Sequence, residues 1–453
     1  MHRRNFIEKF SGLAVGIAAH SQVGAVAKTQ APQRILVVGA GIAGLAAAHA
    51  LQAQGHAVRV LEARERIGGR IWTSTHWPDA PIDLGASWIH GPKGNPLTEL
   101  AHTVKAELLP TRAENAATYA TRGNVLSKAE EARLDGLRRK LISGLKKAQD
   151  AEHDSSVRQA VEALDLSSGD AAETKRHINF ILNGTFEHEY AGSANALSTY
   201  WYDSDKTFAG DDVLFAKGFQ QITQHLAQGL RIETGQVVKE IHWAQSPVQV
   251  VTQSAKYQAD QVLITLPLGV LKAGNVRMQP ALPAAKQSAI AKLGMGVLNK
   301  CCLRFDKAFW PSNVDWLEYI PQRHGEWAEW VSFQHAAHLP VLMGFNAADH
   351  GREIEGWTDA QIVGSAMQTL RVMFGNSVPK PVDYQITRWA SDPFSLGSYS
   401  FNALGSKPPQ RRELAKPLDG RLFFAGEATE EDYFGTAHGA YMSGLRAAQE
   451  MAA

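Results

Sequence analysis

The stretch that decides the fold is residues 34–73, RILVVGAGIAGLAAAHALQAQGHAVRVLEARERIGGRIWT. Its first apolar residues, 35–38, have the composition of a parallel strand that is buried on both faces. The glycines of a G-x-G-x-x-G motif, Gly39, Gly41 and Gly44, then open an Ala/Leu-rich helical pattern. A second strand pattern follows and ends on an acid. Strand, glycine turn, helix and strand in this order predict a βαβ dinucleotide-binding unit.

Each part of this unit has a physical role in holding a dinucleotide. Gly39 permits the tight turn, Gly41 lets backbone N–H groups approach a pyrophosphate, and Gly44 lets the helix pack closely on the strand. Glu62 follows roughly twenty residues after the glycines, where a carboxylate accepts hydrogen bonds from a ribose diol. A lone G-x-G-x-x-G also occurs in turns that bind nothing, but the flanking strand, helix and acid favour a bound dinucleotide. The motif alone does not choose between NAD and FAD.

The residues after Glu62 favour FAD. A second phosphate-facing loop is expected from Arg64, Arg66, Gly68, Gly69 and Arg70. The R-x-G-G-R arrangement at 66–70 resembles the FAD-binding segment of the flavin amine oxidases. Further segments resemble the same family, in the family's order. They are D-x-G-A-x-W-I-H-G (83–91), T-x-P-L-G-V-L (265–271), L-G-x-G-x-x-x-K (293–300) and the C-terminal segment 422–444. Together they extend the resemblance from about residue 33 to the C-terminus.

The resemblance implies an α/β fold with two domains. A Rossmann-like FAD-binding domain of the GR2 flavoprotein type is expected from residues 33–92, 213–302 and 385–453. An inserted α+β substrate-binding domain is expected from residues 93–212 and 303–384. A chain of 453 residues is also longer than one core normally supports, which favours two domains independently of the resemblance.

The resemblance also places the cofactor contacts, and the expected FAD is non-covalent. Ser398 stands where monoamine oxidases carry a cysteine bonded to the flavin, and serine cannot form that thioether. The residues expected at the cofactor are Gly39, Gly41, Ala43, Gly44, Glu62, Ala63, Arg64, Gly69, Arg70, Gly85, Ala86, Ser87, Trp88, Val238, Trp389, Gly426, Glu427, Thr436 and Ala437.

Four residues are expected at the reaction centre. Lys300 matches the family lysine that holds a water against flavin N5; the alternative is a lysine that extends to the surface. Tyr399 matches the aromatic wall of the substrate cavity. His90 is a candidate substrate contact, although a lone histidine is more often structural. Thr436 stands where monoamine oxidases carry a tyrosine, so the aromatic cage is one-sided and favours a slim aliphatic amine.

The predicted function is oxidation of an amine, with a polyamine of the spermine and spermidine class as the substrate. In this family a hydride passes from the carbon beside a neutral amine nitrogen to flavin N5, the imine hydrolyses, and O₂ is reduced to H₂O₂. Oxidation of a monoamine or an L-amino acid stays open, as does a flavin-binding protein without turnover. A histone-type demethylase is disfavoured by the N-terminal segment and by the lack of a basic partner-binding arm.

Residues 1–27 are predicted to be a twin-arginine-type signal peptide. Arg3 and Arg4 precede a short apolar run at 12–19, and Ala-Val-Ala at 25–27 suits cleavage. The alternative is a basic N-terminus without a targeting role. The expected partner is the twin-arginine export machinery and the expected location the periplasm, with secretion as a further destination. Because the run is too short to span a bilayer, no stable membrane insertion is expected after processing.

Composition limits the kinds of partner, cross-link and metal site that this chain is expected to have. A net charge of +1, with 20% charged residues, argues against a nucleic-acid partner. The only two cysteines, Cys301 and Cys302, are adjacent, so no disulfide framework is expected, and no metal site is predicted. Residues 128–150 show the periodicity of an amphipathic helix, and a second helical stretch is expected at about 172–190. Acids follow it at Asp203, Asp205, Asp211 and Asp212, and any of them is a candidate for binding a cation.

Overall fold

The βαβ unit forms where the sequence predicts it. In the computed structural model, which describes residues 31–166 and 170–453, strand β1 (Arg34–Val38), helix α2 (Ile42–Ala53) and strand β2 (Ala57–Leu61) follow one another. Strands β1 and β2 pair in parallel, with Val37 opposite Val60. The predicted signal peptide, residues 1–27, lies outside the described residues.

The unit belongs to a five-stranded parallel sheet in the order β22-β13-β1-β2-β9. The added strands are β9 (Arg231–Glu233), β13 (Gln261–Ile264) and β22 (Leu422–Phe424). The five strands come from segments up to about 390 residues apart in the sequence, from β1 to β22, and all their carboxyl ends lie at one edge of the sheet. This edge is where open parallel sheets bind ligands.

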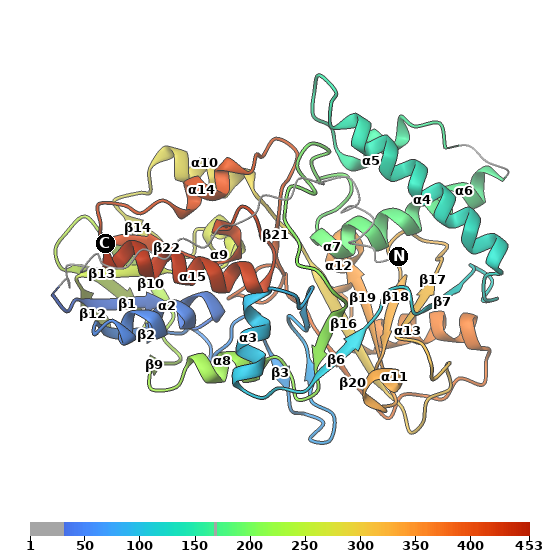
Figure 1. Ribbon diagram of the computed structural model, residues 1–453, viewed down its shortest axis with the longest axis horizontal. Coiled ribbons are helices and arrows are strands. Elements are labelled where there is room, and N and C mark those ends of the chain that lie inside the picture. The colour runs from blue at the N-terminus through green and yellow to red at the C-terminus, as the bar shows by residue number, and fades with distance from the viewer. Residues whose placement is uncertain (1–30, 167–169) are drawn as a thin grey trace.

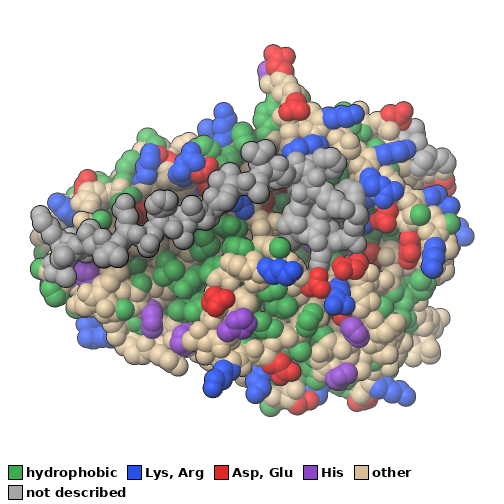
Figure 2. Space-filling model, in the orientation of Figure 1, with side chains coloured by type: hydrophobic (Ala, Val, Ile, Leu, Met, Phe, Trp, Pro, Cys, Tyr) green, Lys and Arg blue, Asp and Glu red, His purple; other side chains and the backbone are tan. Residues whose placement is uncertain are grey.

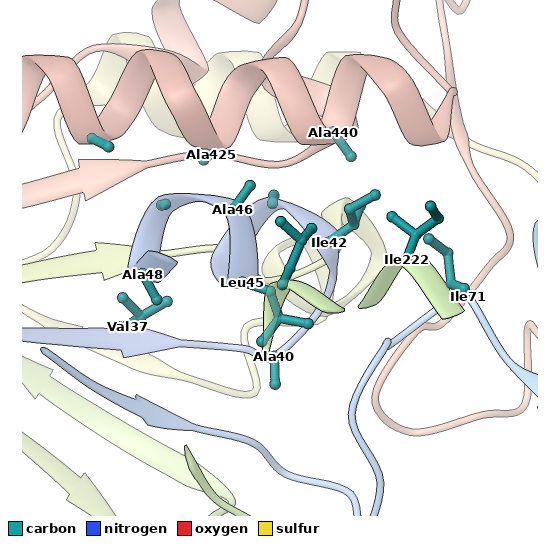
Figure 3. Close-up of a cluster of buried hydrophobic side chains, with 14 of the residues drawn as sticks. Val37, Ala40, Ile42, Leu45, Ala46, Ala48, Ile71, Ile222, Ala425 and Ala440 are labelled. Atoms are coloured by element: carbon teal, nitrogen blue, oxygen red, sulfur yellow. The ribbon is translucent and has the colours of Figure 1, made fainter. Parts of the chain in front are cut away.

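Helix α2 lies between the sheet and the C-terminal helix α15 (Ala437–Ala452). The two helices pack closely against each other (Figure 3). Small side chains make this approach possible: Ala43, Ala46, Ala47 and Ala48 are all buried in the cluster that joins the two helices to the sheet. A Cβ on Gly44 would lie 2.1 Å from the carbonyl oxygen of Gly39. The predicted packing role of Gly44 is therefore confirmed.

A six-stranded sheet forms the other half of the molecule, in the order β20-β16-β19-β18-β17-β7 (Figure 1). Its strands are β7 (Ala116–Tyr119), β16 (Leu298–Arg304), β17 (Trp316–Tyr319), β18 (Glu329–Ser332), β19 (Val341–Ala347) and β20 (Asp383–Ile386). The predicted domain boundaries after residues 302 and 384 cut through β16 and β20, which both pair within this one sheet. The division into domains itself stays a prediction.

Helices gather at one end of the six-stranded sheet. Helix α4 (Lys128–Ala148) confirms the predicted amphipathic helix, with Leu134, Leu137, Leu141 and Leu145 buried on one face. The second predicted helix, 172–190, is interrupted. Helix α6 (Ala171–Leu182) passes into a π-helical turn, η1 (Asn183–Glu187), before the short helix α7 (His188–Tyr190). A π-turn shifts the side chains that follow it around the helix axis, and such turns are frequent at functional sites.

The remaining helices and strands connect or cover these two sheets. They are β3 (Thr73–Ser74), β4 (Ile82–Asp83), β5 (Trp88–Ile89), α3 (Pro96–Thr103), β6 (Leu108–Thr111), α5 (Val157–Glu162), β8 (Asp212–Phe215), α8 (Gln220–Leu226), β10 (Val238–His242), β11 (Val248–Thr252), β12 (Lys256–Ala259), α9 (Leu268–Ala273), β14 (Arg277–Gln279), α10 (Ala284–Lys292), β15 (Gly294–Met295), α11 (Phe333–Ala337), α12 (Ala348–Ile354), α13 (Asp359–Phe374), β21 (Ser400–Phe401), α14 (Pro409–Ala415) and η2 (Glu427–Thr429).

The surface is that of a mixed-charge globular protein. Basic and acidic side chains are interspersed on the face that Figure 2 shows. Within the part of the chain that the structure describes, the helices are all too short or too polar to cross a membrane.

Candidate active site

A large cavity connects the two halves of the molecule. Its volume is about 1600 Å³, and it runs from the glycine turn after β1 to the face of the six-stranded sheet. Ligand pockets are usually about 300–1,000 Å³, so this cavity has room for a dinucleotide and a second molecule. Every residue predicted at the cofactor or the reaction centre lines it, except Gly44, which packs behind the turn.

The N-terminus of α2 is built to face a phosphate. Gly39 has φ +110°, a conformation that only glycine adopts without strain. Gly41 is the N-cap residue, and no described side chain bonds to the first N–H groups of the helix. A Cβ on Gly41 would meet no atom of the described chain within 4 Å, so the approach to these N–H groups is open. Free N–H groups and the helix dipole together favour a bound pyrophosphate.

Glu62 is held in position by the backbone on either side of it. One carboxylate oxygen accepts from the N–H of Ala40 at 2.8 Å, and the other accepts from the N–H of Arg64 at 2.9 Å. A carboxylate oxygen can accept more than one hydrogen bond, so both oxygens keep capacity for a ribose diol. The two backbone N–H groups thus fix the Glu62 carboxylate at the wall of the cavity.

Arg64 connects two segments that are distant in the sequence. Its guanidinium donates to Asp392 at 2.7 Å and to Ser395 at 2.8 Å, which joins the loop after β2 to the segment before Tyr399. Arg64 still lines the cavity. A contact between Arg64 and the cofactor stays a prediction. Its hydrogen bonds to Asp392 and Ser395 stabilise the fold.

Glu427 is the centre of a buried network at the second glycine turn. It accepts from Arg70 at 2.8 Å, from the Ser400 hydroxyl at 2.5 Å and from the Gly435 N–H at 3.0 Å. Fully buried Arg411 donates to the same Ser400 hydroxyl at 2.7 Å. Burial raises the pKa of Glu427, but Arg70 and Ser400 outweigh burial, so its pKa lies below the ordinary value. The carboxylate is ionised and fixed at the cavity wall.

These observations fit FAD. The open glycine turn suits the pyrophosphate, Glu62 suits the adenosine ribose, and the Glu427 turn with Thr436 and Ala437 lines the far end of the same cavity. Val238 and Trp389 line the cavity as well; Trp389 is buried, and its indole N–H donates to the Leu84 carbonyl at 3.3 Å.

Lys300 is buried on β16 and points at the turn that follows β4. Its ammonium lies 2.8 Å from the Asp83 carbonyl, 2.6 Å from the Gly85 carbonyl and 2.6 Å from the Ser87 hydroxyl. The Nζ atom also lies 5.6 Å from the centre of the Trp88 ring. Burial lowers the pKa of Lys300 to about 8. The predicted surface-directed alternative is wrong, because this side chain is only 4% exposed.

The donors of Lys300 bear on its predicted role. An ammonium has three donors and no acceptor, and the described contacts use all three. A water at Nζ therefore requires that one of these bonds opens, or that the lysine is neutral and accepts with its lone pair. A pKa of about 8 makes the neutral form accessible near physiological pH. The water itself stays a prediction.

The other predicted reaction-centre residues lie around the same space. The Tyr399 hydroxyl donates to the His188 carbonyl at 2.6 Å. The His90 ring lies 2.7 Å from Asp212 and stacks on Trp88 at 6.2 Å between ring centres. The Thr436 hydroxyl donates to the Tyr433 carbonyl and caps α15, so it is used by the chain itself. All four residues line the cavity.

The structure adds residues that the sequence did not single out. His188 and Glu329 line the cavity and lie 2.6 Å apart, both with side chains less than 10% exposed. Trp316 and Phe345 form an aromatic wall beside them. Of the acids noted from the sequence, Asp203, Asp205 and Asp212 line the cavity. No local motif marks Glu329, and only the alternation of β18 could have placed it on the cavity face.

The described residues contain no metal centre. Across residues 31–166 and 170–453, no three His, Cys, Asp or Glu side chains are grouped as a metal ion requires. Cys301 and Cys302 are both buried, and burial raises the pKa of the Cys302 thiol to about 12. Both thiols lie on β16 of the six-stranded sheet, and a raised pKa keeps the Cys302 thiol protonated and therefore weakly nucleophilic.

Comparison with known proteins agrees with this geometry. Residues 42–452 match the family model described as flavin containing amine oxidoreductase. Polyamine oxidase 4 of Oryza sativa subsp. japonica is 34% identical over 443 residues, covering 92% of this chain and 88% of that protein. Lysine-specific histone demethylase 1 homolog 1 of the same plant is 35% identical over 443 residues, but this chain spans only 52% of its length.

A solved structure of similar fold is a double mutant of putrescine oxidase, whose cofactor binding was redesigned. It superposes with a TM-score of 0.75 at 20% identity and covers 93% of this chain and 99% of that one. At this identity the likeness concerns the fold. The similarity extends over both sheets of the molecule, because it includes nearly the whole of each chain.

Proposed function

The chain belongs to the flavin-containing amine oxidoreductases and is a FAD-dependent amine oxidase, and on that premise we propose that its substrate is a polyamine. The observation that carries this proposal is the lining of the cavity beyond the residues that suit FAD. This lining continues along an aromatic wall to buried and half-buried carboxylates. Such a lining suits a slim aliphatic chain with several positive charges.

The residues that would hold FAD are those of the two glycine turns. Backbone N–H groups at Gly41 would meet the pyrophosphate, Glu62 the ribose, and the Glu427 turn the remainder. When bound, FAD supplies the acceptor for the hydride that leaves the carbon beside the amine nitrogen, and O₂ takes the electrons on. Ser398 donates to the Leu298 carbonyl at 3.0 Å and cannot form a thioether, which supports non-covalent FAD.

The chain's own residues orient the substrate and exclude water. Lys300 fixes the turn that carries Gly85 and Ser87, and this turn lines the cavity. Trp88, Trp316 and Phe345 form an apolar wall along which an alkyl chain can lie. A dry wall of this kind favours the neutral form of the amine nitrogen at the reacting end, since burial disfavours the charged form.

Hydrogen peroxide release from a panel of amines tests the proposal. Purified holoenzyme is assayed with spermine, spermidine, their acetylated derivatives, putrescine, tyramine and L-amino acids. Polyamines are expected to give the highest kcat/KM. Peroxide released only from tyramine or an amino acid would contradict the proposal, and retention of bound FAD with no turnover of any amine would indicate a flavin-binding protein without this activity.

Demethylation is the second candidate, because the demethylase homologue matches as closely in identity as the polyamine oxidase. A methylated lysine side chain is a secondary or tertiary amine, like an internal polyamine nitrogen, so the two activities share their chemistry. A peptide with methylated lysine therefore belongs in the same panel. Formaldehyde release from this peptide, with no turnover of free polyamines, would favour the demethylase.

A further inference from the structure

Arg411 is a buried cation behind the wall of the cavity. It lies on α14, and its side chain is fully buried without lining the cavity itself. Its guanidinium carbon lies 4.0 Å from the centre of the Phe434 ring. Its Nε atom donates to the Asn402 amide oxygen at 3.1 Å, and its Nη1 atom donates to the Ser400 hydroxyl at 2.7 Å. Because Phe434 and Ser400 both line the cavity, Arg411 supports two parts of its wall.

Stability alone does not account for this arginine. Among the residues that the structure describes, the Nη2 atom of Arg411 has no hydrogen-bond partner, and an unpaired buried donor is destabilising. Burial lowers the pKa of Arg411 to about 10, so the protein keeps a charge here at a cost. Charges kept at such a cost are frequent at functional sites. Arg411 is therefore expected to have a role besides packing.

The Ser400 hydroxyl connects Arg411 to Glu427. An arginine only donates and an ionised carboxylate only accepts, whereas a serine hydroxyl does both. Ser400 therefore accepts from Arg411 and donates its own proton to Glu427, at 2.5 Å. The hydrogen bonds run in one direction, from the guanidinium to the carboxylate, and each one polarises the next. The orientation of the Glu427 carboxylate thus depends on Arg411.

Arg411 also helps to keep Glu427 ionised. Burial raises the pKa of Glu427, but Arg70, the Ser400 hydroxyl and the charge of Arg411 together hold this pKa below its ordinary value. Removing Arg411 takes away one of these positive charges and leaves the Ser400 hydroxyl without its donor. The pKa of Glu427 is then expected to rise.

Two contacts that involve Arg411 or its partner Glu427 meet at the turn before α15. Phe434 packs on the guanidinium, and Glu427 accepts from the N–H of Gly435 at 3.0 Å. Gly435 has φ +71° and is followed by Thr436, the N-cap residue of α15. Phe434, Gly435 and Thr436 all line the cavity. Arg411 therefore holds, from behind, a turn that faces the expected cofactor.

We infer that Arg411 is a positioning residue for FAD, which orients Glu427 through Ser400, holds the turn at Phe434, and thereby slows release of the cofactor. It acts through these residues and lies outside the cavity lining. This role depends on FAD as the cofactor and not on which amine is oxidised. Failure of the polyamine proposal would therefore leave it intact, and its own failure would leave the polyamine proposal intact.

Release of FAD from the holoenzyme tests this role without turnover. Holoenzyme is diluted strongly, and the rise of FAD fluorescence gives the release rate from about pH 5.5 to 8, where an ordinary glutamate is ionised. Arg411→Met, which removes the charge and the donors, should release FAD about tenfold faster than wild type at about pH 7. The ratio of the two rates should grow as the pH falls, because Glu427 takes up a proton at higher pH in the variant than in wild type.

Lys286→Met is the matched control. Lys286 is also a fully buried cation, its Nζ atom lies 4.1 Å from the centre of the Phe424 ring, and it donates to three backbone carbonyls at the C-terminal end of α14. It does not line the cavity. Both methionine variants should lower the melting temperature. Lys286→Met should leave FAD release within about twofold of wild type, with a ratio that is constant with pH.

Two further variants separate the charge from the hydrogen-bonded link. Arg411→Lys keeps a cation and a donor, and it should bring FAD release back to within about threefold of wild type. Ser400→Ala cuts the link to Glu427 and leaves the contacts of Arg411 with Phe434 and Asn402. It should speed release less than Arg411→Met does, with the same growth of the ratio as the pH falls.

Three results would overturn the role of Arg411. They are equal effects of Arg411→Met and Lys286→Met on FAD release, a release ratio for Arg411→Met that does not change with pH, and no rescue by Arg411→Lys. Should Arg411→Met not retain FAD on purification, Ser400→Ala decides. Release from Ser400→Ala at the wild-type rate, or faster release with a ratio independent of pH, would likewise overturn it.

Discussion

Lys300 shows how a costly residue is accommodated in this site. A buried ammonium without partners would be strongly destabilising, but here two carbonyls and one hydroxyl surround the charge. Burial still dominates, and the pKa is lowered to about 8. The side chain therefore fixes a turn at the cavity in its charged form and can change protonation close to the working pH.

Replacing Lys300 by methionine tests its role in the redox chemistry. The substitution keeps the length of the side chain and removes the charge and the donors. FAD should stay bound, because the groups that suit it belong to Gly41, Glu62, Arg70 and Glu427. Reduction by amine, reoxidation by O₂, or both should slow by about 10²-fold or more, the scale of a lost positioned catalytic group. Stopped-flow of both half-reactions is the measurement; rates within about threefold of wild type would make Lys300 a purely structural residue.

The lowered pKa of Lys300 also predicts a pH dependence of stability. In the unfolded chain the lysine titrates near 10.5, and in the folded chain at about 8. Between these values the unfolded state binds more protons, so the free energy of unfolding rises with pH across this window. Relative to Lys300→Met, wild type should gain up to about 3 kcal/mol from pH 8 to 10.5. Denaturant unfolding of both proteins at several pH values measures this difference, and a constant difference would contradict the assignment.

At the scale of elements, the contact between α2 and α15 decides how the glycine turn is held. A Cβ on Gly444 would lie 2.2 Å from the Ala43 carbonyl oxygen, so the two helices approach through a glycine. Ala43 lies in the first turn of α2, whose N–H groups face the cavity. Any shift of α15 away from α2 therefore moves the expected pyrophosphate site.

Gly444→Ala should accordingly destabilise the protein. Glycine to alanine within a helix normally stabilises by about 1 kcal/mol, but forcing a Cβ into a backbone contact costs about 1–3 kcal/mol. A lower melting temperature and weaker FAD binding are expected. Gly364→Ala on α13 is the control: its Cβ would meet no described atom within 4 Å, and it should raise the melting temperature. A stabilised Gly444→Ala protein would show that the helices can separate at no cost.

The sequence predicts those elements well that depend on interactions between residues close together in the chain. A turn or a packing contact within the βαβ unit itself requires each of the glycines Gly39, Gly41 and Gly44. The motif therefore identifies the unit from the sequence. The lysine of the L-G-x-G-x-x-x-K segment was placed by resemblance, and the structure puts it in the cavity. The pair His188–Glu329 escaped prediction because its members are 141 residues apart and meet only through sheet register and a π-turn.

The sequence predicts one helix over 172–190, whereas the structure has two α-helices, α6 and α7, separated by the π-helical turn η1. The apolar spacing of this segment favours a continuous helix, and the one glycine of the π-turn at Asn183–Glu187, Gly184, is tolerated inside a helical pattern. That turn is stabilised by tertiary contacts: Glu187 accepts from the Asn183 amide and from the Ala194 N–H, both at 2.9 Å. Contacts of this kind are not visible in the hydrophobic pattern, which explains the difference.

At the scale of the whole molecule, the five-stranded sheet and the six-stranded sheet both line one cavity. The five-stranded sheet contributes the glycine turns, and the six-stranded sheet contributes Lys300, Phe345 and Glu329 (Figure 1). One sheet thus carries residues that suit the cofactor, and the other carries residues that suit the amine.

Export is a prediction about the whole protein that depends on residues 1–27. Replacing Arg3 and Arg4 by lysine should keep active holoenzyme in the cytoplasm, because a twin-arginine signal requires both arginines. Cell fractionation with a peroxide assay on each fraction measures the distribution. Unchanged delivery to the periplasm would show that these residues are not a twin-arginine signal.

The most direct test of the central claim is an anaerobic titration of the oxidised holoenzyme with spermidine, followed by the visible absorbance of the flavin. One equivalent of a two-electron donor should bleach the bound flavin completely, and admission of O₂ should restore the colour with release of one equivalent of H₂O₂. If neither spermidine nor any other polyamine bleaches the flavin, while a monoamine or an amino acid does, the account of the cavity as a polyamine site is contradicted.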